Sequence, residues 1–188
     1  MEEDQILENM SELQKYIVLL LKANNRELIK GNTWFQKELF LISKNIPSVA
    51  EEASFEADMY GPFSETAEEE LEELGMDDVV LKSGNKVFLS SLGDKIAAKI
   101  KSNISKEEFE MISEFKTLLN DLNPEEVLTL IYFTFPNMTQ ESLVLDNIKK
   151  HRKKIAIELY KKGKISLQRA SEIADLPLEI FVEEIKNI

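Results

Sequence analysis

The sequence contains no cysteine and only one histidine, His151, among its 188 residues. Without cysteine the chain has no disulfide framework, no thiolate nucleophile and no sulfur-ligated metal. A hydrolytic triad would have to be built around His151 alone, so we expect a protein that is not an enzyme. The 6 glycines are isolated and form no phosphate-binding loop, and no calcium-loop spacing is present. We therefore predict no cofactor and no metal site.

Long apolar runs are also absent. The longest, residues 16–21, is too short to cross a bilayer, and the first residues are acidic where a secretory signal would be basic. We therefore expect a cytoplasmic protein without a membrane partner. A hydrophobic content of 43% with 31% charged residues suits one medium domain or two small ones.

Basic residues are scarce except near the C-terminus. Residues 1–147 hold 13 basic and 29 acidic side chains, a balance of −16, within a chain whose net charge is −12. Residues 148–188 hold 10 basic and 6 acidic side chains, a balance of +4. Within them, residues 148–169 contain nine Lys or Arg and one acid, Glu158. A block of like charge indicates either a solvated face or a contact surface for a partner of opposite sign.

The basic block has the pattern of a helix with a cationic face. At 100° per residue, four lysines share one face and three apolar residues lie opposite: Lys150, Lys153, Lys154 and Lys161 against Ile148, Ile155 and Leu159. Ile157 interrupts the basic face. A cationic stripe on a packed helix suits a phosphate backbone. The predicted nucleic-acid-binding residues are Lys149, Lys150, Arg152, Lys153, Lys154, Lys161, Lys162, Lys164 and Arg169. The alternative is a solvated face, or one that packs against the acidic half of the chain or against a partner.

The remaining pattern predicts a mainly α (α+β) protein in three parts. Residues 6–103 show the order of a winged-helix domain, in which helices precede a short β-hairpin and a last helix. The expected elements are helices at 11–24, after Gly31, at 64–74 and at 94–101, with hairpin strands at 79–81 and 86–89. Lys82 and Lys86 on the hairpin are possible wing contacts to a nucleic-acid backbone.

Residues 104–147 are predicted to be a helical connector and dimerisation region. Ser105 and Asn123-Pro124 are helix-start signals, and the stretch 127–135 is apolar enough to be buried in a core or in a homodimer interface. Thr139 is expected to cap a helix that continues to Lys162. Residues 148–188 then form a helix–turn–helix unit, with short helices at 166–174 and from Leu178 to about Asn187.

Two helices carry the wrong charge for reading bases. The last helix presents Glu179, Glu183 and Glu184 against a single Lys186, and the helix at 64–74 contains six glutamates and no base. Carboxylates are repelled by phosphates. We therefore expect contact with the nucleic-acid backbone through the basic helix, whereas the acidic helix faces solvent or a basic protein.

Four aromatic residues raise the question of a small-ligand pocket. Trp34, Phe35, Phe40 and Tyr60 could line one, although aromatics at helical spacing are typical of a core.

Two stretches resemble known prokaryotic families. The helix from Trp34 to Ile42 with its Gln36-Lys37, the turn Tyr60-Gly61-Pro62-Phe63-Ser64, the hairpin and Leu92-Gly93 resemble winged-helix proteins that include the Panacea-type antitoxin domains. Ile131-Tyr132-Phe133 through Pro136, with Thr139 to Ser142, is similar to the helical tail of such proteins.

The second resemblance lies in the C-terminal part. Leu159-Tyr160, Gly163-Lys164-Ile165-Ser166 and Ala170 resemble the helix–turn–helix region of small type II antitoxin proteins. Together the resemblances imply an antitoxin-like protein or a transcription regulator. The function predicted from the sequence is a non-enzymatic, dimeric DNA-binding regulator; the alternative is an interaction module for a basic protein such as a toxin. An unrecognised enzyme is a third, less favoured interpretation.

Overall fold

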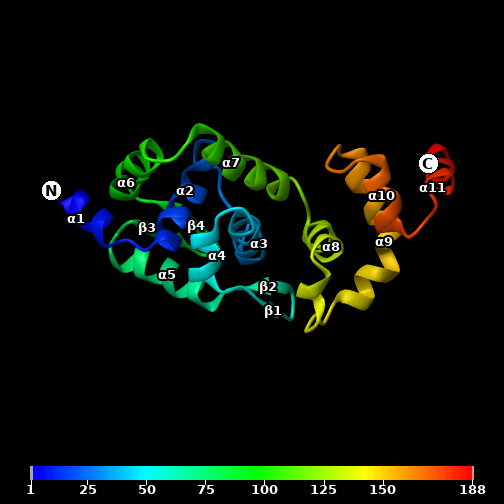
Figure 1. Cartoon of the computed structure of the whole chain (residues 1–188), viewed down its shortest axis with the longest axis horizontal. Coiled ribbons are helices and arrows are strands. Elements are labelled where there is room, and N and C mark those ends of the chain that lie inside the picture. The colour runs from blue at the N-terminus through cyan, green and yellow to red at the C-terminus, as the bar shows by residue number, and fades with distance from the viewer. Residues whose placement is uncertain (1, 188) are drawn as a thin grey trace. The chain divides into compact units, whose positions relative to one another are not determined.

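A computed structural model describes residues 2–187 of the chain, which is mainly helical with two small two-stranded sheets (Figure 1). The predicted mainly α class is thus confirmed. The chain divides into two compact units. The N-terminal unit comprises Met1–Glu56 with Pro62–Asp121, and the C-terminal unit comprises Ala57–Gly61 with Leu122–Ile188. No helix within the described residues is both long and apolar enough to cross a membrane.

Within residues 2–121 the elements are seven helices and four strands: α1 (Glu2–Asn9), α2 (Glu12–Arg26), α3 (Asn32–Ser43), α4 (Pro47–Ala53), β1 (Glu56–Asp58), β2 (Gly61–Phe63), α5 (Glu65–Met76), β3 (Val80–Ser83), β4 (Lys86–Leu89), α6 (Ser91–Ser102) and α7 (Lys106–Asn120). The later elements are α8 (Pro124–Thr134), the 3₁₀ helix η1 (Pro136–Thr139), α9 (Leu145–Lys161), α10 (Leu167–Ala174) and α11 (Leu178–Lys186).

Polar residues define both ends of helix α2. Ser11 forms a capping box with Gln14, in which each side chain bonds the backbone of the other residue. Asn24 and Asn25 adopt left-handed φ values of 55° and 54°, which asparagine tolerates better than most residues. Between these ends α2 buries an apolar face that forms the centre of the N-terminal core.

Helix α3 is tied to the chain before α5 by two buried side chains. The Gln36 amide bonds both the N–H and the C=O of Ser64, at 2.9 and 3.1 Å, and Lys37 Nζ donates to the carbonyl of Pro62 at 3.1 Å. These residues belong to the motifs that carry the Panacea-type resemblance. Their structural role is to fix the start of α5 against α3.

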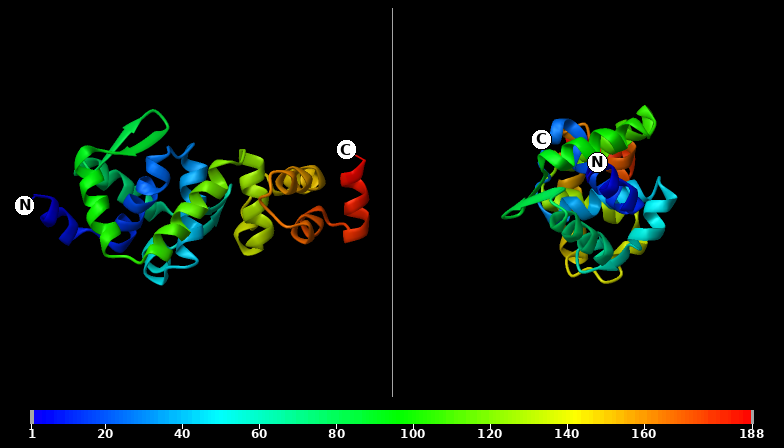
Figure 2. Two further views of the ribbon diagram at one scale, coloured as in Figure 1. Left: turned by 90° about the horizontal axis from the view of Figure 1, so that it is seen from above. Right: turned by 90° about the vertical axis from the view of Figure 1, so that its left-hand side faces the viewer.

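Helix α5 and the β3–β4 hairpin follow in the predicted order. Ser64 caps α5 as expected, but the helix continues through Gly75 to Met76. Val80 pairs with Leu89 and Ser83 with Lys86, and the hairpin extends away from the helices of its unit (Figure 2). A β-carbon added to Gly93 on α6 would lie 2.0 Å from the carbonyl oxygen of Val79, so the close approach of α6 to the base of the hairpin requires glycine.

Two ionisable groups are fully buried in the N-terminal unit. Lys116 on α7 donates to the carbonyls of Leu20 and Ala23 at 2.9 and 3.0 Å. Both carboxylate oxygens of Glu38 on α3 lack a hydrogen-bond partner. Burial raises the pKa of Glu38 to about 9, partly offset by the positive charge of Lys116, and burial lowers the pKa of Lys116 to about 8.

The C-terminal unit consists mainly of helices that pack on α9. An Asn123–Glu126 capping box starts α8, which packs against α9. Helix α10 packs against α9, and α11 packs on α10 after a turn at Asp175, whose φ is 60°. The core of this trihelical part includes Ile157, Ile173 and Phe181.

Several local predictions were wrong. The segment Tyr60–Phe63, expected to be a turn, contains the strand β2 (Gly61–Phe63). Helices α1 and α4 were not predicted. Thr139 does not cap a long helix, because its hydroxyl donates to the carbonyl of Pro136 within η1, and α9 begins only at Leu145. Helix α6 begins at Ser91 and contains Gly93, which was expected to precede the helix. The three-part division of the chain and the winged-helix class of its first part stay predictions.

Candidate nucleic-acid interface

The basic segment forms α9, which is packed along much of its circumference. Its buried side chains are Ile148, Ile155, Ala156, Ile157 and Leu159. Ile157, which was expected to interrupt the basic face, is 6% exposed and belongs to the core shared with α10 and α11. Gly163, with a φ of 68°, follows the end of the helix and donates its N–H to the carbonyl of Tyr160. The cations of α9 therefore divide into those directed towards neighbouring helices and those directed to solvent.

Arg152 binds the C-terminal end of α10. Its guanidinium donates to the carbonyls of Ile173 and Glu172 and to the carboxylate of Asp175, the last at 3.3 Å. The guanidinium carbon also lies 4.6 Å from the centre of the Phe133 ring, in cation–π geometry. Carbonyls at the end of a helix lack helical donors, and Arg152 supplies donors there, although the Glu172 carbonyl also accepts the N–H of Asp175 at 3.1 Å.

Arg169 connects α10 to the end of α8. It donates to the carbonyl of Phe133 at 2.6 Å and to the carboxylate of Glu172 at 3.0 Å. The hydrogen bond from Arg169 lowers the pKa of Glu172 below its usual value. A side chain that joins two helices in this way is available to a phosphate only if these bonds break.

Lys162 neutralises a buried carboxylate. Its Nζ lies 2.6 Å from Oε2 of Glu126, whose side chain is only 1% exposed. The same oxygen accepts the N–H of Asn123 at 2.8 Å in the α8 capping box. The structure thus gives Arg152, Arg169 and Lys162 intramolecular roles that the sequence did not indicate.

Two lysines of α9 have exposed acidic neighbours. Lys153 lies 3.1 Å from Glu184 of α11, and Lys154 lies 3.9 Å from Glu158 one turn later in α9. The side chains of Lys153 and Lys154 are 51% and 79% exposed. Exposed ion pairs of this kind contribute about 0–1 kcal/mol, so a phosphate can replace the acidic partner at small cost.

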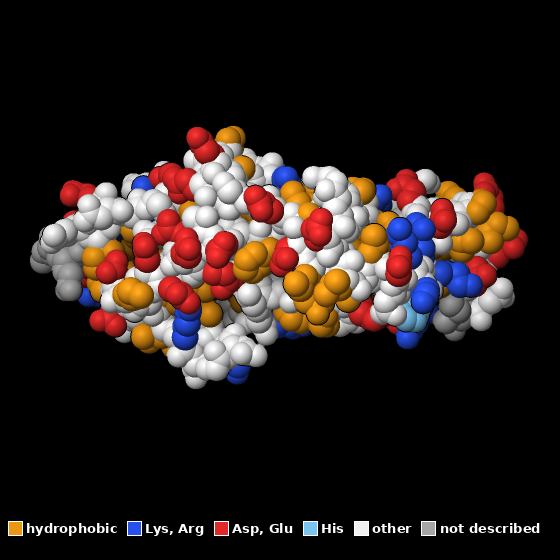
Figure 3. Space-filling view, turned by 90° about the horizontal axis from the view of Figure 1, so that it is seen from below, with side chains coloured by type: hydrophobic (Ala, Val, Ile, Leu, Met, Phe, Trp, Pro, Cys, Tyr) orange, Lys and Arg blue, Asp and Glu red, His pale blue; other side chains and the backbone are white. Residues whose placement is uncertain are grey.

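Lys149, Lys150 and Lys161 are exposed and have no hydrogen bond or ion pair within residues 2–187. Lys150, Lys154 and Lys161 follow one line along α9, at steps of four and seven residues, and we call these three the lysine ridge. Lys150 and Lys161 are eleven positions apart in the helix, so the two ends of the lysine ridge are about 16 Å apart. Figure 3 shows Lys and Arg side chains gathered around the single histidine, with acidic side chains among them.

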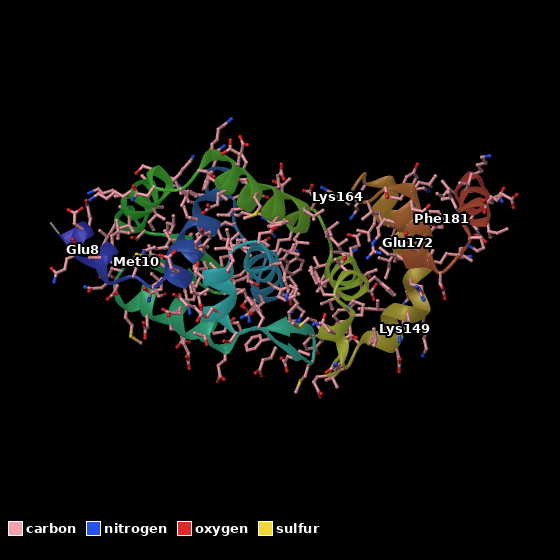
Figure 4. The ribbon with its side chains drawn as sticks, in the orientation of Figure 1. Glu8, Met10, Lys149, Lys164, Glu172 and Phe181 are labelled. Atoms are coloured by element: carbon pink, nitrogen blue, oxygen red, sulfur yellow. The ribbon has the colours of Figure 1, made fainter. Side chains whose placement is uncertain are left out.

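The other predicted cations lie outside the ridge. Lys149 lies near the start of α9, whereas the half-buried Lys164 lies in the turn before α10 (Figure 4). Lys82 and Lys86 are exposed on β3 and β4 of the N-terminal unit. The predicted residues therefore belong to two different units, and within the C-terminal unit those exposed along α9 form the most continuous set.

Some glutamates of α5 accept hydrogen bonds within the protein, whereas others on α5 and α11 are exposed to solvent. On α5, Glu68, Glu70 and Glu73 accept hydrogen bonds from the side chains of neighbouring α2 and α3, whose donors are Gln36, Ser11 and Gln14. Glu65, Glu69 and Glu72 are exposed on one stripe of α5. On α11, Glu179 and Glu183 are exposed.

The single histidine, His151, and the four predicted aromatic residues do not all lie on one element. His151 is exposed on α9, and the described residues contain no group of three or more acidic or histidine side chains placed to hold a metal ion. The predicted aromatic group is divided: Trp34 Nε1 donates to the carbonyl of Leu119 at 3.0 Å, whereas Phe40 packs edge-on against Phe55. Tyr60 belongs to the C-terminal unit.

Comparison with known proteins relates the C-terminal part of the chain to a protein family. No curated protein matches the chain, and no solved structure matches it either. Over residues 131–187, which extend from α8 into α11, the chain is similar to an uncharacterised protein family (UPF0175).

Proposed function

We propose that the chain is a non-enzymatic, antitoxin-like regulator whose C-terminal unit contacts the DNA backbone through the lysine ridge and Lys149. The observation that carries the proposal is the contrast within the basic segment. Arg152, Lys162 and Arg169 are engaged inside the unit, whereas Lys149, Lys150 and Lys161 are exposed without a partner in the described residues. Cations that the fold does not use are the ones available to an external polyanion.

Contact with the backbone fits the surroundings of the ridge better than base reading. Helix α11, the last of the trihelical part, presents exposed Glu179 and Glu183. Carboxylates inserted into a groove would meet phosphates of the same sign. Lysine is a flexible point charge and suits phosphate contacts that carry no sequence information. We therefore expect modest sequence preference and a strong dependence on salt.

The test is binding of a labelled random DNA duplex by fluorescence anisotropy across a salt series. The ridge variant carries Lys150→Gln and Lys161→Gln. The matched control carries Lys106→Gln and Lys186→Gln, two other exposed lysines, so that net charge changes equally. Each lost phosphate contact lowers the log–log salt slope by about 0.9, so the ridge variant should lose about 1.8. Equal affinity and slope in the two variants, or no binding by the wild type at low salt, would contradict the proposal.

A second candidate function is an interaction module for a basic protein. It is favoured by the exposed stripe of Glu65, Glu69 and Glu72 on α5, whose carboxylates have no hydrogen bond or ion pair within residues 2–187. A lysine-rich peptide that binds wild type, but not the variant with these three residues changed to Gln, would support this function. Loss of peptide binding with unchanged DNA binding would assign the two partners to different surfaces.

The proposed regulator is a homodimer. The apolar faces of α7 and α8 are largely buried, and Ile112, Leu119, Val127 and Ile131 are each at most 1% exposed. Among the described residues of the C-terminal unit, the large apolar side chains left exposed are Met59, Tyr60, Leu143 and Ile180. Sedimentation velocity of the wild type and of Leu143→Gln tests whether the exposed side chain of Leu143 contributes to a dimer.

A further inference from the structure

A cleft in the N-terminal unit shares no residue with the α9 surface proposed to contact DNA. It has a volume of about 330 Å³ and lies between the start of α3, helix α5 and the β3–β4 hairpin. Ile29, Phe35 and Leu71 line it, each at most 4% exposed, together with the half-buried Val87. These apolar side chains give the cleft a surface that favours an apolar group.

Two opposite charges also line this cleft without forming a pair. Lys82 of β3 is exposed and has no hydrogen bond or ion pair within the described residues. Glu68 of α5 accepts a hydrogen bond from Gln36 at 2.6 Å through Oε1 and makes no ion pair with Lys82. The carboxylate therefore keeps acceptor capacity on its second oxygen, and the ammonium keeps all three of its donors. The amides of Asn32 and Asn85 add neutral hydrogen-bonding groups.

The charges around the cleft restrict the net charge of a ligand. An anion would interact with Lys82, but it would be repelled by Glu68 and by the exposed Glu65, Glu69 and Glu72 of the same helix. A cation would be attracted by Glu68, but it would be repelled by Lys82 and would leave the ammonium donors of Lys82 without a partner. A ligand with both charges and no net charge satisfies both lining groups and is not disfavoured by the acidic helix.

We propose that this cleft binds an α-amino acid with an apolar side chain. The ligand carboxylate faces Lys82, its ammonium faces Glu68, and its side chain lies on Phe35 and Leu71. The start of α3 lines the same cleft, and Gly31 provides no side-chain cap there, so the positive end of the helix dipole adds to the field at the carboxylate. The volume lies at the small end of the range of about 300–1,000 Å³ for ligand pockets, which suits a ligand of this size.

The proposal does not depend on DNA binding, because every lining residue belongs to the N-terminal unit and none belongs to α9. The structure also provides a reporter. Trp34 is the only tryptophan, and the nearest atom of its side chain would lie 3.9 Å from a β-carbon on Gly31, which lines the cleft.

The test uses the full-length protein in equilibrium dialysis with radiolabelled L-leucine and L-phenylalanine, with Trp34 fluorescence recorded in parallel. Two analogues each lack one charge of leucine: 4-methylpentanoate lacks the ammonium, and 3-methylbutylamine lacks the carboxylate. We expect saturable binding of one amino acid per chain and at least about tenfold weaker binding of both analogues, because each leaves one lining charge without a partner.

Matched variants test whether Lys82 and Glu68 are the charged groups that contact the ligand. Lys82→Gln should weaken leucine binding about tenfold, whereas Lys86→Gln on the neighbouring strand should not. Glu68→Gln should weaken it similarly, whereas Glu69→Gln should not; the glutamine oxygen still accepts the bond from Gln36, which preserves the fold. The proposal is overturned if neither amino acid binds saturably at about 10 mM, or if each variant and its control bind leucine equally.

Discussion

Glu38 is a carboxyl group that the fold keeps from water without giving it a hydrogen-bond partner. Burial raises the pKa of Glu38 to about 9. Between pH 4.5 and 9 its carboxyl group is therefore protonated in the folded protein and ionised in the unfolded chain. The free energy of unfolding should therefore fall as pH rises through this window, by at most about 1.4 kcal/mol per pH unit. Glu38→Gln should flatten this dependence, and urea unfolding at pH 5, 6 and 7.5 measures it. An unchanged slope in the variant would show that Glu38 is ionised in the folded protein.

Lys116 makes stability depend on pH in the opposite direction, and at higher pH. Its pKa is lowered to about 8, so the unfolded chain binds the extra proton between pH 8 and 10.5, and stability should rise with pH there.

Lys116→Met removes the donor for the carbonyls of Leu20 and Ala23 near the end of α2. We expect a loss of about 2–3 kcal/mol of stability at pH 7, because hydrogen bonds from charged donors are the stronger ones. Lys106→Met, on an exposed position of the same helix, is the control.

At the scale of elements, helix ends and the hairpin could be predicted from local chemistry. Ser11, Ser64, Ser105 and Ser166 cap the helices that they were expected to start, because a serine oxygen and a nearby backbone N–H meet within one turn. The beginning of α9 could not be predicted, because it depends on distant contacts. Ser142 bonds the hydroxyl of Tyr132 at 2.8 Å, ten residues away, and its side-chain oxygen accepts the N–H of Val144 just before α9 at 3.2 Å.

The candidate site was predictable as a segment but not residue by residue. Sequence periodicity identified a basic helix, and α9 is that helix. It could not distinguish Arg152 from Lys150, because only the tertiary structure shows that one meets the end of α10 and the other meets solvent. The burial of Glu38 and Lys116 was also missed, since charged residues carry no periodic signal of being inside.

The position of α10 should depend on Arg152. Arg152→Gln removes the charge-assisted bonds to the carbonyl groups of Ile173 and Glu172, and we expect about 2 kcal/mol less protection of α10 amides in hydrogen exchange. Lys150→Gln, on the exposed side of the same helix, should leave exchange unchanged. Equal exchange in the two variants would mean that the apolar contacts of α10 suffice.

At the scale of the whole molecule, the two compact units should respond separately to substitutions. Glu38 lies in the core of the N-terminal unit, and Arg152 lies in the C-terminal unit. We expect differential scanning calorimetry to show two transitions, with Glu38→Gln shifting one and Arg152→Gln shifting the other. A single transition moved by both substitutions would show that the units unfold together.

The bonds from Gln36 and Lys37 to the segment before α5 have a consequence for sequence divergence. They reach only main-chain atoms, at Pro62 and Ser64. Exchange of side chains along that stretch would therefore leave these bonds possible, whereas insertion of one residue would displace their targets by about 3.5 Å. Related chains could thus keep the spacing of this segment after its amino-acid identities have changed.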